Sequence, residues 1–200
     1  INQYGLDQFK YFLLREVSLG NDGDYSKSSF LNRINADLSN NLGNLIQRTL
    51  KFLSKNFSKI IPYTIVDADL KSEPLINGYD LLNKVDEQMK KYQISLSLQL
   101  IFDYIASLNR FMDKEEPWNS FKINPEKTGK DLSILIECFR LIGIILQPFI
   151  PNASSKILDI LNINKNYRSF KYFKIDYKII KGHIINEPEP IFPRYETKDC

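Results

Sequence analysis

Apolar residues recur every three or four positions along most of the chain, which is the spacing of one face of an α-helix. This spacing predicts helices at residues 6–17, 29–60, 79–91, 94–114, 124–147 and 152–161. We expect a turn at 20–24, a connecting loop at 67–78, and another loop that carries Trp118. No long run of alternating apolar and polar residues indicates strands. The predicted fold class is therefore all-α, a helical bundle.

The helix predicted at 124–147 is apolar on nearly all sides after Leu132, which is typical of the central helix of a bundle. Asn124 is a favourable N-cap, and the following proline suits the first helical position. Cys138 lies on this helix, and we expect it to be a small core residue. From residue 162 onwards, lysine alternates with tyrosine, phenylalanine and isoleucine. We expect that tail to be an irregular strap with one short helix, folded back over the bundle.

The helix predicted at 29–60 has two different faces. Its apolar residues form one stripe, and the opposite side carries a basic ladder of Asn41, Arg48, Lys51, Lys55 and Lys59. Residues 27–59 contain six basic residues and one acidic residue, a local balance of +5, whereas the whole chain has a formal charge of +3. The modest total charge therefore conceals a basic surface suited to neutralising phosphates.

Two groups beside this ladder can recognise a nucleotide. Asn44 and Arg48 lie four residues apart on one face, and offer an amide and a rigid fork of donors to a base edge. Trp118, the only tryptophan, can stack on an unpaired base. Other interpretations stay open at this point. A lysine-rich face is often merely solvated, Trp118 can be a lid on the core, and Asn44 can satisfy backbone groups where Gly43 lets another helix approach.

The sequence lacks the residues and motifs that most kinds of catalysis need. The single histidine, His183, is expected at the surface rather than in a catalytic role, and no C-x-x-C pair or phosphate-binding glycine loop is present. The paired acids Asp67/Asp69 and Glu115/Glu116 are expected to be solvated or to cap helices. We therefore expect no active site, metal or cofactor within these 200 residues.

Composition places the chain among ordinary globular proteins. It is 43% hydrophobic and 26% charged, and it has no uninterrupted apolar run of the length that a membrane helix needs. Cys138 and Cys200 cannot form a disulfide framework, which favours a reducing compartment. The first residues lack the basic and apolar regions of a signal peptide. These features predict a cytoplasmic location without membrane contact.

Several segments, in order along the chain, resemble the part of bacterial methionyl-tRNA synthetases that follows the catalytic domain. They are YGLD at 4–7, YFLLREV at 11–17, GNDGDYS at 20–26, NRINADL at 32–38, NLGNLIQRT at 41–49, EPW at 116–118 and IFPR at 191–194. The resemblance implies the α-helical anticodon-binding domain of a class I aminoacyl-tRNA synthetase. In that family, positions matching Asn44, Arg48 and Trp118 read the CAU anticodon, and Asn41, Lys51 and Lys55 are expected to support RNA backbone contacts.

The resemblance also implies an activity for the complete enzyme. Such an enzyme uses ATP and Mg²⁺, with zinc as a further candidate metal, to ligate methionine to initiator and elongator tRNA(Met). The catalytic HIGH and KMSKS signatures are not in this sequence. We therefore expect a non-catalytic, monomeric piece of the ligase that works with its own catalytic domain.

Three segments are expected within the piece. Residues 1–25 would form a hinge helix from the catalytic domain, 26–164 the anticodon-binding bundle, and 165–200 a C-terminal strap. The chain departs from the family at Lys10, where arginine is common, and at residues 162–182, which match no known element. Two alternatives are an anticodon domain of another class I synthetase, such as that for leucine or valine, and a helical protein-interaction module.

Overall fold

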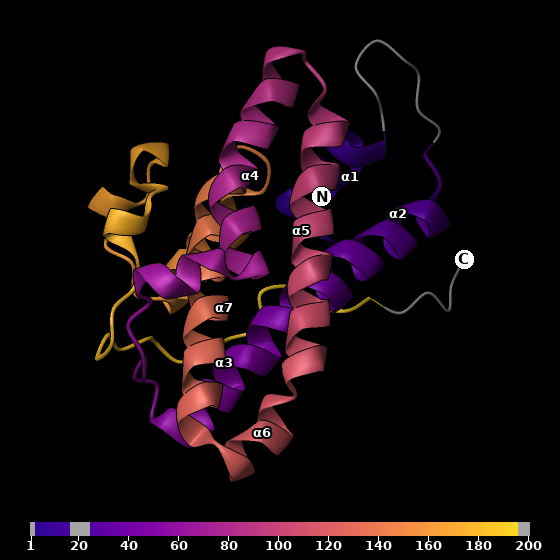
Figure 1. Cartoon of the computed structure of the whole chain (residues 1–200). Helices are drawn as coiled ribbons and strands as arrows, with labels where there is room; N and C mark the ends of the chain where they lie inside the picture. Colours follow the sequence, from indigo (N-terminus) through magenta and orange to yellow (C-terminus); the bar gives the residue numbers. More distant parts are fainter. Residues whose placement is uncertain (1–2, 17–24, 196–200) are drawn as a thin grey trace.

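The computed structural model describes residues 3–16 and 25–195 (Figure 1). Within those ranges the prediction of an all-α fold is confirmed, since there is no strand and only one isolated β-bridge, between Ile60 and Ile184. The elements in chain order are α1 (Leu6–Glu16), α2 (Lys27–Arg33), the π-helix η1 (Ile34–Gly43), α3 (Asn44–Phe57), the 3₁₀ turn η2 (Asp67–Lys71), α4 (Glu73–Lys90), α5 (Ile94–Glu115), α6 (Pro117–Ile123), α7 (Pro125–Ile145), α8 (Pro151–Ile160), and the 3₁₀ turns η3 (Lys165–Tyr167), η4 (Phe170–Tyr172) and η5 (Ile175–Tyr177).

Helix α7 is the centre of the bundle, as its sequence predicts. Every residue from 132 to 146 is buried, and α7 contacts α3, α4, α5, α6 and α8. Asn124 caps its first turn, accepting a hydrogen bond of 2.9 Å from the Lys127 backbone N–H. Cys138 is fully buried in this core, and burial raises the pKa of its thiol to about 12. The thiol is therefore protonated and unreactive in the folded protein.

The long helix predicted at 29–60 is confirmed as one uninterrupted helical run from Lys27 to Phe57, but its ends and the width of its turns differ from the prediction. The run begins after the N-cap Ser26, and its middle part, η1, has the wider turns of a π-helix. It ends at Phe57, because Ser58 adopts a left-handed conformation with φ of 52°. The N–H of Asn44 bonds the carbonyl of Ser39, five residues back. A Cβ at Gly43 would lie 3.0 Å from the backbone oxygen of Leu38 and 3.8 Å from Phe192. This glycine therefore accommodates the wide turn and the C-terminal strap, rather than another helix.

Two predicted loops are shorter than expected. The loop predicted at 67–78 contains η2, and α4 already begins at Glu73, because a proline is well tolerated in a first helical turn. The predicted loop around Trp118 is a short helix, α6, whose first residue is Pro117. Helix α1 ends at Glu16 among the described residues. Val17, the turn at 20–24 and Cys200 lie outside the described residues.

The acidic pairs have mixed roles. The carboxylate of Asp69 accepts 2.9 Å hydrogen bonds from the Val66 N–H and the Tyr63 hydroxyl, and it pairs with Lys130. The expectation that these acids are solvated or cap helices is thus confirmed for Asp69 by its capping contact, and the residue is 4% exposed. Glu115 pairs with Lys127, at the junction of α5, α6 and α7.

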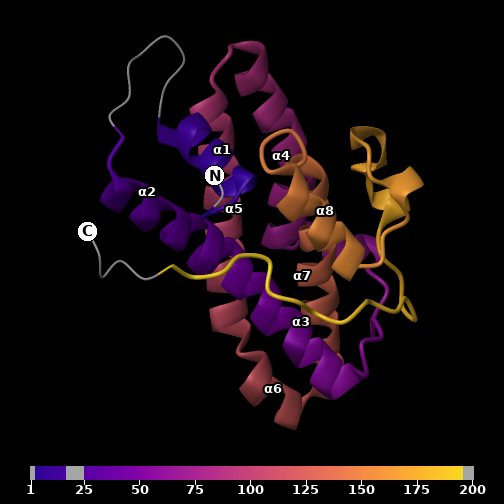
Figure 2. The ribbon, with the colours of Figure 1, turned by 180° about the vertical axis from the view of Figure 1, so that it is seen from behind.

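The tail folds back over the bundle with three 3₁₀ turns, η3 to η5, instead of the one short helix expected (Figure 2). The strap then crosses η1, where Ser39 donates to the carbonyl of Pro193 and Asn35 exchanges two hydrogen bonds with the backbone of Tyr195. His183 is partly buried, and its Nε2 lies 2.7 Å from the carbonyl of Leu161, which indicates a structural role. In the described ranges, no helix has the length and apolar character to cross a membrane.

Candidate nucleic-acid interface

The polar contact between α3 and α5 fixes the predicted site residue Arg48. Its guanidinium Nη1 lies 2.7 Å from the Asp113 carboxylate, and Nη2 lies 3.1 Å from the side-chain oxygen of Asn109. The Nε atom is buried and has no hydrogen-bond partner among the described residues. The fork is therefore held in a fixed orientation by its two partners on α5.

The amide of Asn109 connects this ion pair to η1. Its nitrogen donates to the side-chain oxygen of Asn41 at 2.7 Å and to the Asn41 backbone oxygen at 3.2 Å. Asn41, Asn109, Arg48 and Asp113 thus form one continuous polar row across η1, α3 and α5. Asn44, the first residue of α3, is exposed to solvent one turn before Arg48. The structure therefore leaves the Asn44 amide accessible and holds Asn41 in the supporting row.

The lysines of the predicted ladder differ in their partners. Lys51 and Lys55 are exposed, and neither forms an ion pair with a described residue. Lys59 instead pairs with Glu187 of the strap, with Nζ 3.3 Å from the carboxylate. Two of the ladder's positive charges, those of Arg48 and Lys59, are thus partly compensated. The accessible charge for phosphate groups is concentrated on Lys51 and Lys55.

Trp118 is held at the edge of this region by the anchoring of α6. Phe121, one turn further along α6, packs edge-to-face on Phe52 and Phe57 of α3, with ring centroids 5.9 and 5.4 Å apart. Pro117 is buried, whereas Trp118 is 42% exposed. Because residues three apart lie on the same side of a helix, Trp118 lies beside the side of α6 that meets α3. Its indole is therefore an accessible aromatic surface, and not a fully covered lid.

The structure brings most of the predicted site onto neighbouring elements. Asn41 comes from η1, Asn44, Arg48, Lys51 and Lys55 from α3, and Trp118 from α6. Sequence reasoning missed Asn109 and Asp113, which orient Arg48. Their four-residue spacing on α5 beside an apolar stripe is a weak signal, because it does not reveal which helix they face. No cluster of three or more metal-binding side chains occurs in the part of the chain described.

Comparisons with known proteins agree on one family. Residues 72–200 match the model of the anticodon binding domain of methionyl tRNA ligase, and residues 1–50 match that of the class I tRNA synthetases for methionine. The chain belongs to the methionyl-tRNA synthetase family. This membership confirms the resemblance on which the anticodon-domain interpretation depends, and it excludes a class I synthetase family of another specificity.

Relatives and solved structures match over almost all of the chain. The methionine–tRNA ligase of Rickettsia felis is 41% identical over 199 residues, which are 98% of this chain and 39% of that protein. The corresponding ligase of Mesorhizobium japonicum is 38% identical, over 98% of this chain and 38% of that protein. The chain thus spans about two fifths of the length of these relatives, and it corresponds to a part of the ligase.

The crystal structures confirm the fold of the domain. The free form of Mycobacterium tuberculosis methionyl-tRNA synthetase has a TM-score of 0.90 and 33% identity, covering 98% of this chain and 40% of that chain. The form bound by methionyl-adenylate also has a TM-score of 0.90, with 32% identity over 96% of this chain and 38% of that chain. The helical bundle is therefore the family's arrangement.

Proposed function

We propose that this chain binds the anticodon loop of tRNA(Met) and thereby helps a methionine–tRNA ligase to select its tRNA. The observation that carries the proposal is the juxtaposition of a half-exposed indole, Trp118, with a basic, amide-bearing helix face in a member of this family. Such a combination of stacking surface, planar donors and lysines suits single-stranded RNA loops.

Each group has a separate task in this proposal. Lys51 and Lys55 neutralise loop phosphates, and Trp118 stacks on an anticodon base that has left the loop stack. Asn44 offers both a donor and an acceptor to a base edge. Arg48 offers its fork, held by Asp113 and Asn109 so that little side-chain entropy is lost on binding. Asn41 supports this arrangement through Asn109.

The remainder of the enzyme completes the reaction in this proposal. ATP, Mg²⁺ and any zinc would be held by the catalytic domain of the complete enzyme. Residues 1–25 would act as the hinge toward that domain, 26–164 as the recognition bundle and 165–200 as the strap. We further propose a cytoplasmic, monomeric enzyme that serves both initiator and elongator tRNA(Met).

The test is a titration with two anticodon stem-loops, one carrying CAU and one with its first base changed, at two salt concentrations. The full-length protein is compared with its Trp118→Ala variant. We expect a preference for CAU, and a loss of about 1–3 kcal/mol of binding free energy when the indole is removed. Tyr92→Ala is the matched control, because Tyr92 is an exposed aromatic residue, 74% accessible, at the turn between α4 and α5.

Equal binding of both loops with a steep salt dependence would refute anticodon reading and leave only a basic patch. Weak salt dependence of the residual binding would instead favour a protein-interaction module. An effect of Tyr92→Ala as large as that of Trp118→Ala would show that the loss is not specific to this surface.

A further inference from the structure

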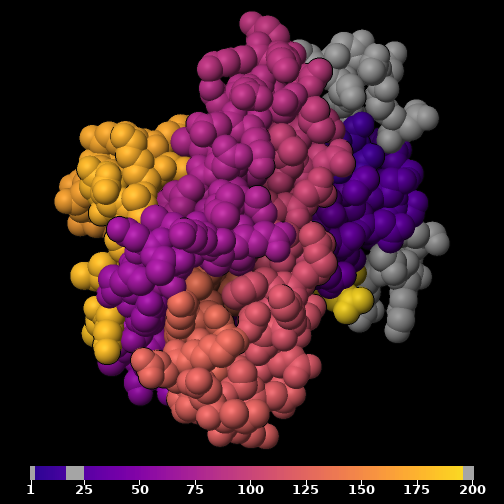
Figure 3. Space-filling view, viewed as in Figure 1, coloured from indigo at the N-terminus to yellow at the C-terminus, as the bar shows by residue number. Residues whose placement is uncertain are grey.

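The tyrosine-rich segment (residues 162–182) is a basic and aromatic protrusion that the anticodon-binding proposal does not use. It contains six basic residues and one acidic residue, Asp176, which is a local balance of +5. The space-filling view shows it standing out from the bundle on the side of α4, well away from α6 (Figure 3). Arg168 pairs with Asp159, but the lysines of this segment form no ion pair with a described residue.

The segment is anchored from beneath by a buried ion pair on α7. Arg140 and Glu137, 1% and 0% exposed, are joined by a 2.6 Å contact. Arg140 also donates to the backbone oxygens of Tyr172 and Lys174, at 2.8 and 3.2 Å. Glu137 accepts from the backbone N–H of Ile179 at 3.0 Å. The middle and the C-terminal part of the segment are thus fixed to the core.

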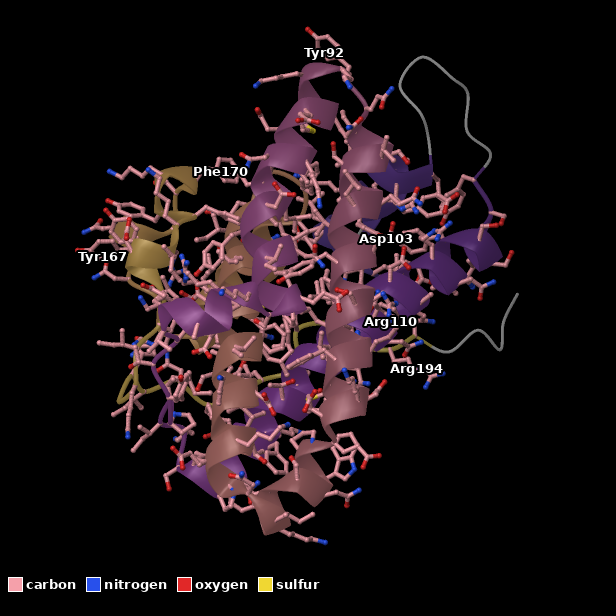
Figure 4. The ribbon with its side chains drawn as sticks, in the orientation of Figure 1. Tyr92, Asp103, Arg110, Tyr167, Phe170 and Arg194 are labelled. Carbon is pink, nitrogen blue, oxygen red and sulfur yellow. The ribbon has the colours of Figure 1, made fainter. Side chains whose placement is uncertain are left out.

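Three tyrosines form a cluster on this anchored surface. The ring of Tyr172 lies 5.0 Å from that of Tyr167 and 4.7 Å from that of Tyr177, both edge-to-face. Tyr167 and Tyr177 stay 48% and 44% exposed, and the Lys171 ammonium lies 4.7 Å from the Tyr172 ring. Figure 4 shows Tyr167 on the outer side of the protrusion, away from α5, and Phe170 on the side that faces α4.

A cavity of about 300 Å³ opens beside the two exposed tyrosines. Its lining includes Tyr167, Tyr177, Lys178, His183 and the amide of Asn164. The Leu161 carbonyl can only accept, so the Nε2 atom of His183 is the donor in that contact. The cavity therefore combines aromatic rings, polar side chains that can bond the edge of a base, and a lysine. Its volume lies at the lower end of the range found for ligand-binding pockets.

We propose that the tyrosine-rich segment is a second RNA-binding surface, which takes an unpaired nucleotide against Tyr167 and Tyr177 while its lysines neutralise the flanking phosphates. Aromatic faces with interleaved lysines are the combination that binds single-stranded nucleic acid without sequence preference. The nucleotide has two sources, an unpaired position of the bound tRNA and another RNA strand. The proposal goes beyond anticodon recognition and does not need Trp118.

The same surface is less suited to an anionic membrane. Membrane-surface segments place their apolar residues on one face of an amphipathic helix, and here the backbone forms only three-residue turns. Lysines are interspersed among the aromatic and aliphatic residues along this part of the sequence, so its exposed apolar groups are separated by charges. RNA is therefore the partner that this arrangement favours.

The test measures the affinity of the full-length protein for three RNAs: a CAU stem-loop, whole tRNA(Met) and a short unstructured oligouridine. The Tyr167→Ala/Tyr177→Ala variant should bind the whole tRNA, the oligouridine or both about 5- to 140-fold more weakly. It should bind the stem-loop as the wild type does. Tyr167→Phe/Tyr177→Phe keeps the rings and should keep the affinity, and Tyr92→Ala is the exposed-aromatic control. Circular dichroism confirms that each variant is folded.

Two further comparisons show which RNA supplies the nucleotide and how much the lysines contribute to binding. A loss confined to whole tRNA assigns the nucleotide to the tRNA, and a loss that includes oligouridine assigns it to RNA strands in general. Lys174→Gln/Lys178→Gln should reduce the slope of log affinity against log salt by about 1.4 on oligouridine. Unchanged affinity of the folded alanine variant for both RNAs would overturn the proposal. The proposal would also be overturned if the alanine variant lost binding to phosphatidylserine vesicles but kept the RNA affinity of the wild type.

The two proposals fail separately. Trp118→Ala should lower stem-loop affinity and leave oligouridine affinity unchanged if the tyrosine-rich segment is an independent site. If Trp118→Ala removes oligouridine binding and the tyrosine variant does not, the single-stranded RNA is bound at the anticodon surface and the second site is refuted.

Discussion

Replacing Arg140 by methionine is expected to destabilise the protein by about 3–5 kcal/mol, because it leaves the buried carboxylate of Glu137 without its counter-charge. Arg140 reaches this carboxylate with Nε and Nη2 at 2.6–3.1 Å. Tyr79 and the Ile179 N–H remain as its only hydrogen-bond donors in the described part of the chain. These neutral donors do not compensate the charge.

The magnitude is a large share of the total stability. A domain of this kind is stable by about 5–15 kcal/mol, so the variant loses roughly a fifth of that or more. At about 2–4 °C per kcal/mol for a chain of this length, the melting temperature should fall by about 6–20 °C. The same change frees the carbonyls of Tyr172 and Lys174, so the tyrosine-rich segment should loosen before the bundle unfolds.

Urea unfolding followed by circular dichroism measures the first effect, and hydrogen exchange at Ile179 and its neighbours measures the second. Arg110→Met is the matched control, since Arg110 is exposed on α5 (Figure 4), and it should change stability by no more than about 0.5 kcal/mol. The double variant Arg140→Met/Glu137→Leu should cost less than the sum of its two single changes, because no buried charge is left alone. A cost for Arg140→Met below about 1 kcal/mol, or full additivity in the cycle, would refute the reasoning.

Two other outcomes follow from local packing and charge. Gly143→Ala should lower the free energy of unfolding by about 1–3 kcal/mol in urea titrations, because the new Cβ would lie 2.9 Å from the Leu158 Cγ; a neutral change would show that α8 moves away easily. Burial raises the pKa of Asp69, but hydrogen bonds from Lys130, the Val66 N–H and Tyr63 outweigh it and hold the pKa below 3.8. The resulting stabilisation is complete above that unfolded value and is lost as the pH falls through the lower folded value. The stability advantage of wild type over Asp69→Asn should therefore shrink only below about pH 4, and a loss already near neutral pH would contradict this assignment.

The sequence by itself determined the elements whose signals are local. The apolar period located α5, and the proline at position 117 placed its C-terminal end to within one residue. The Asn124–Pro125 pair fixed the start of α7. The continuous apolar character after Leu132 made α7 the central helix, since only a helix surrounded by others can bury every side. The family resemblance selected Asn44, Arg48 and Trp118 as site residues, and family membership is confirmed. Their contacts with RNA stay predictions.

Only the tertiary structure decided the features that depend on contacts between distant segments. The π-helix η1 has no local sequence signal that distinguishes it from an α-helix. It lies against Phe192 of the strap at Gly43. Arg48 meets Asn109 and Asp113 because α3 packs beside α5, and spacing along one helix does not reveal its neighbour. The lysines and tyrosines of the tail have no periodic pattern from which a conformation could be predicted. The path of the backbone there is set by its hydrogen bonds to the buried pair Arg140 and Glu137 on α7. Local periodicity thus determined which segments are helical, and the packing of those helices determined which polar groups face one another.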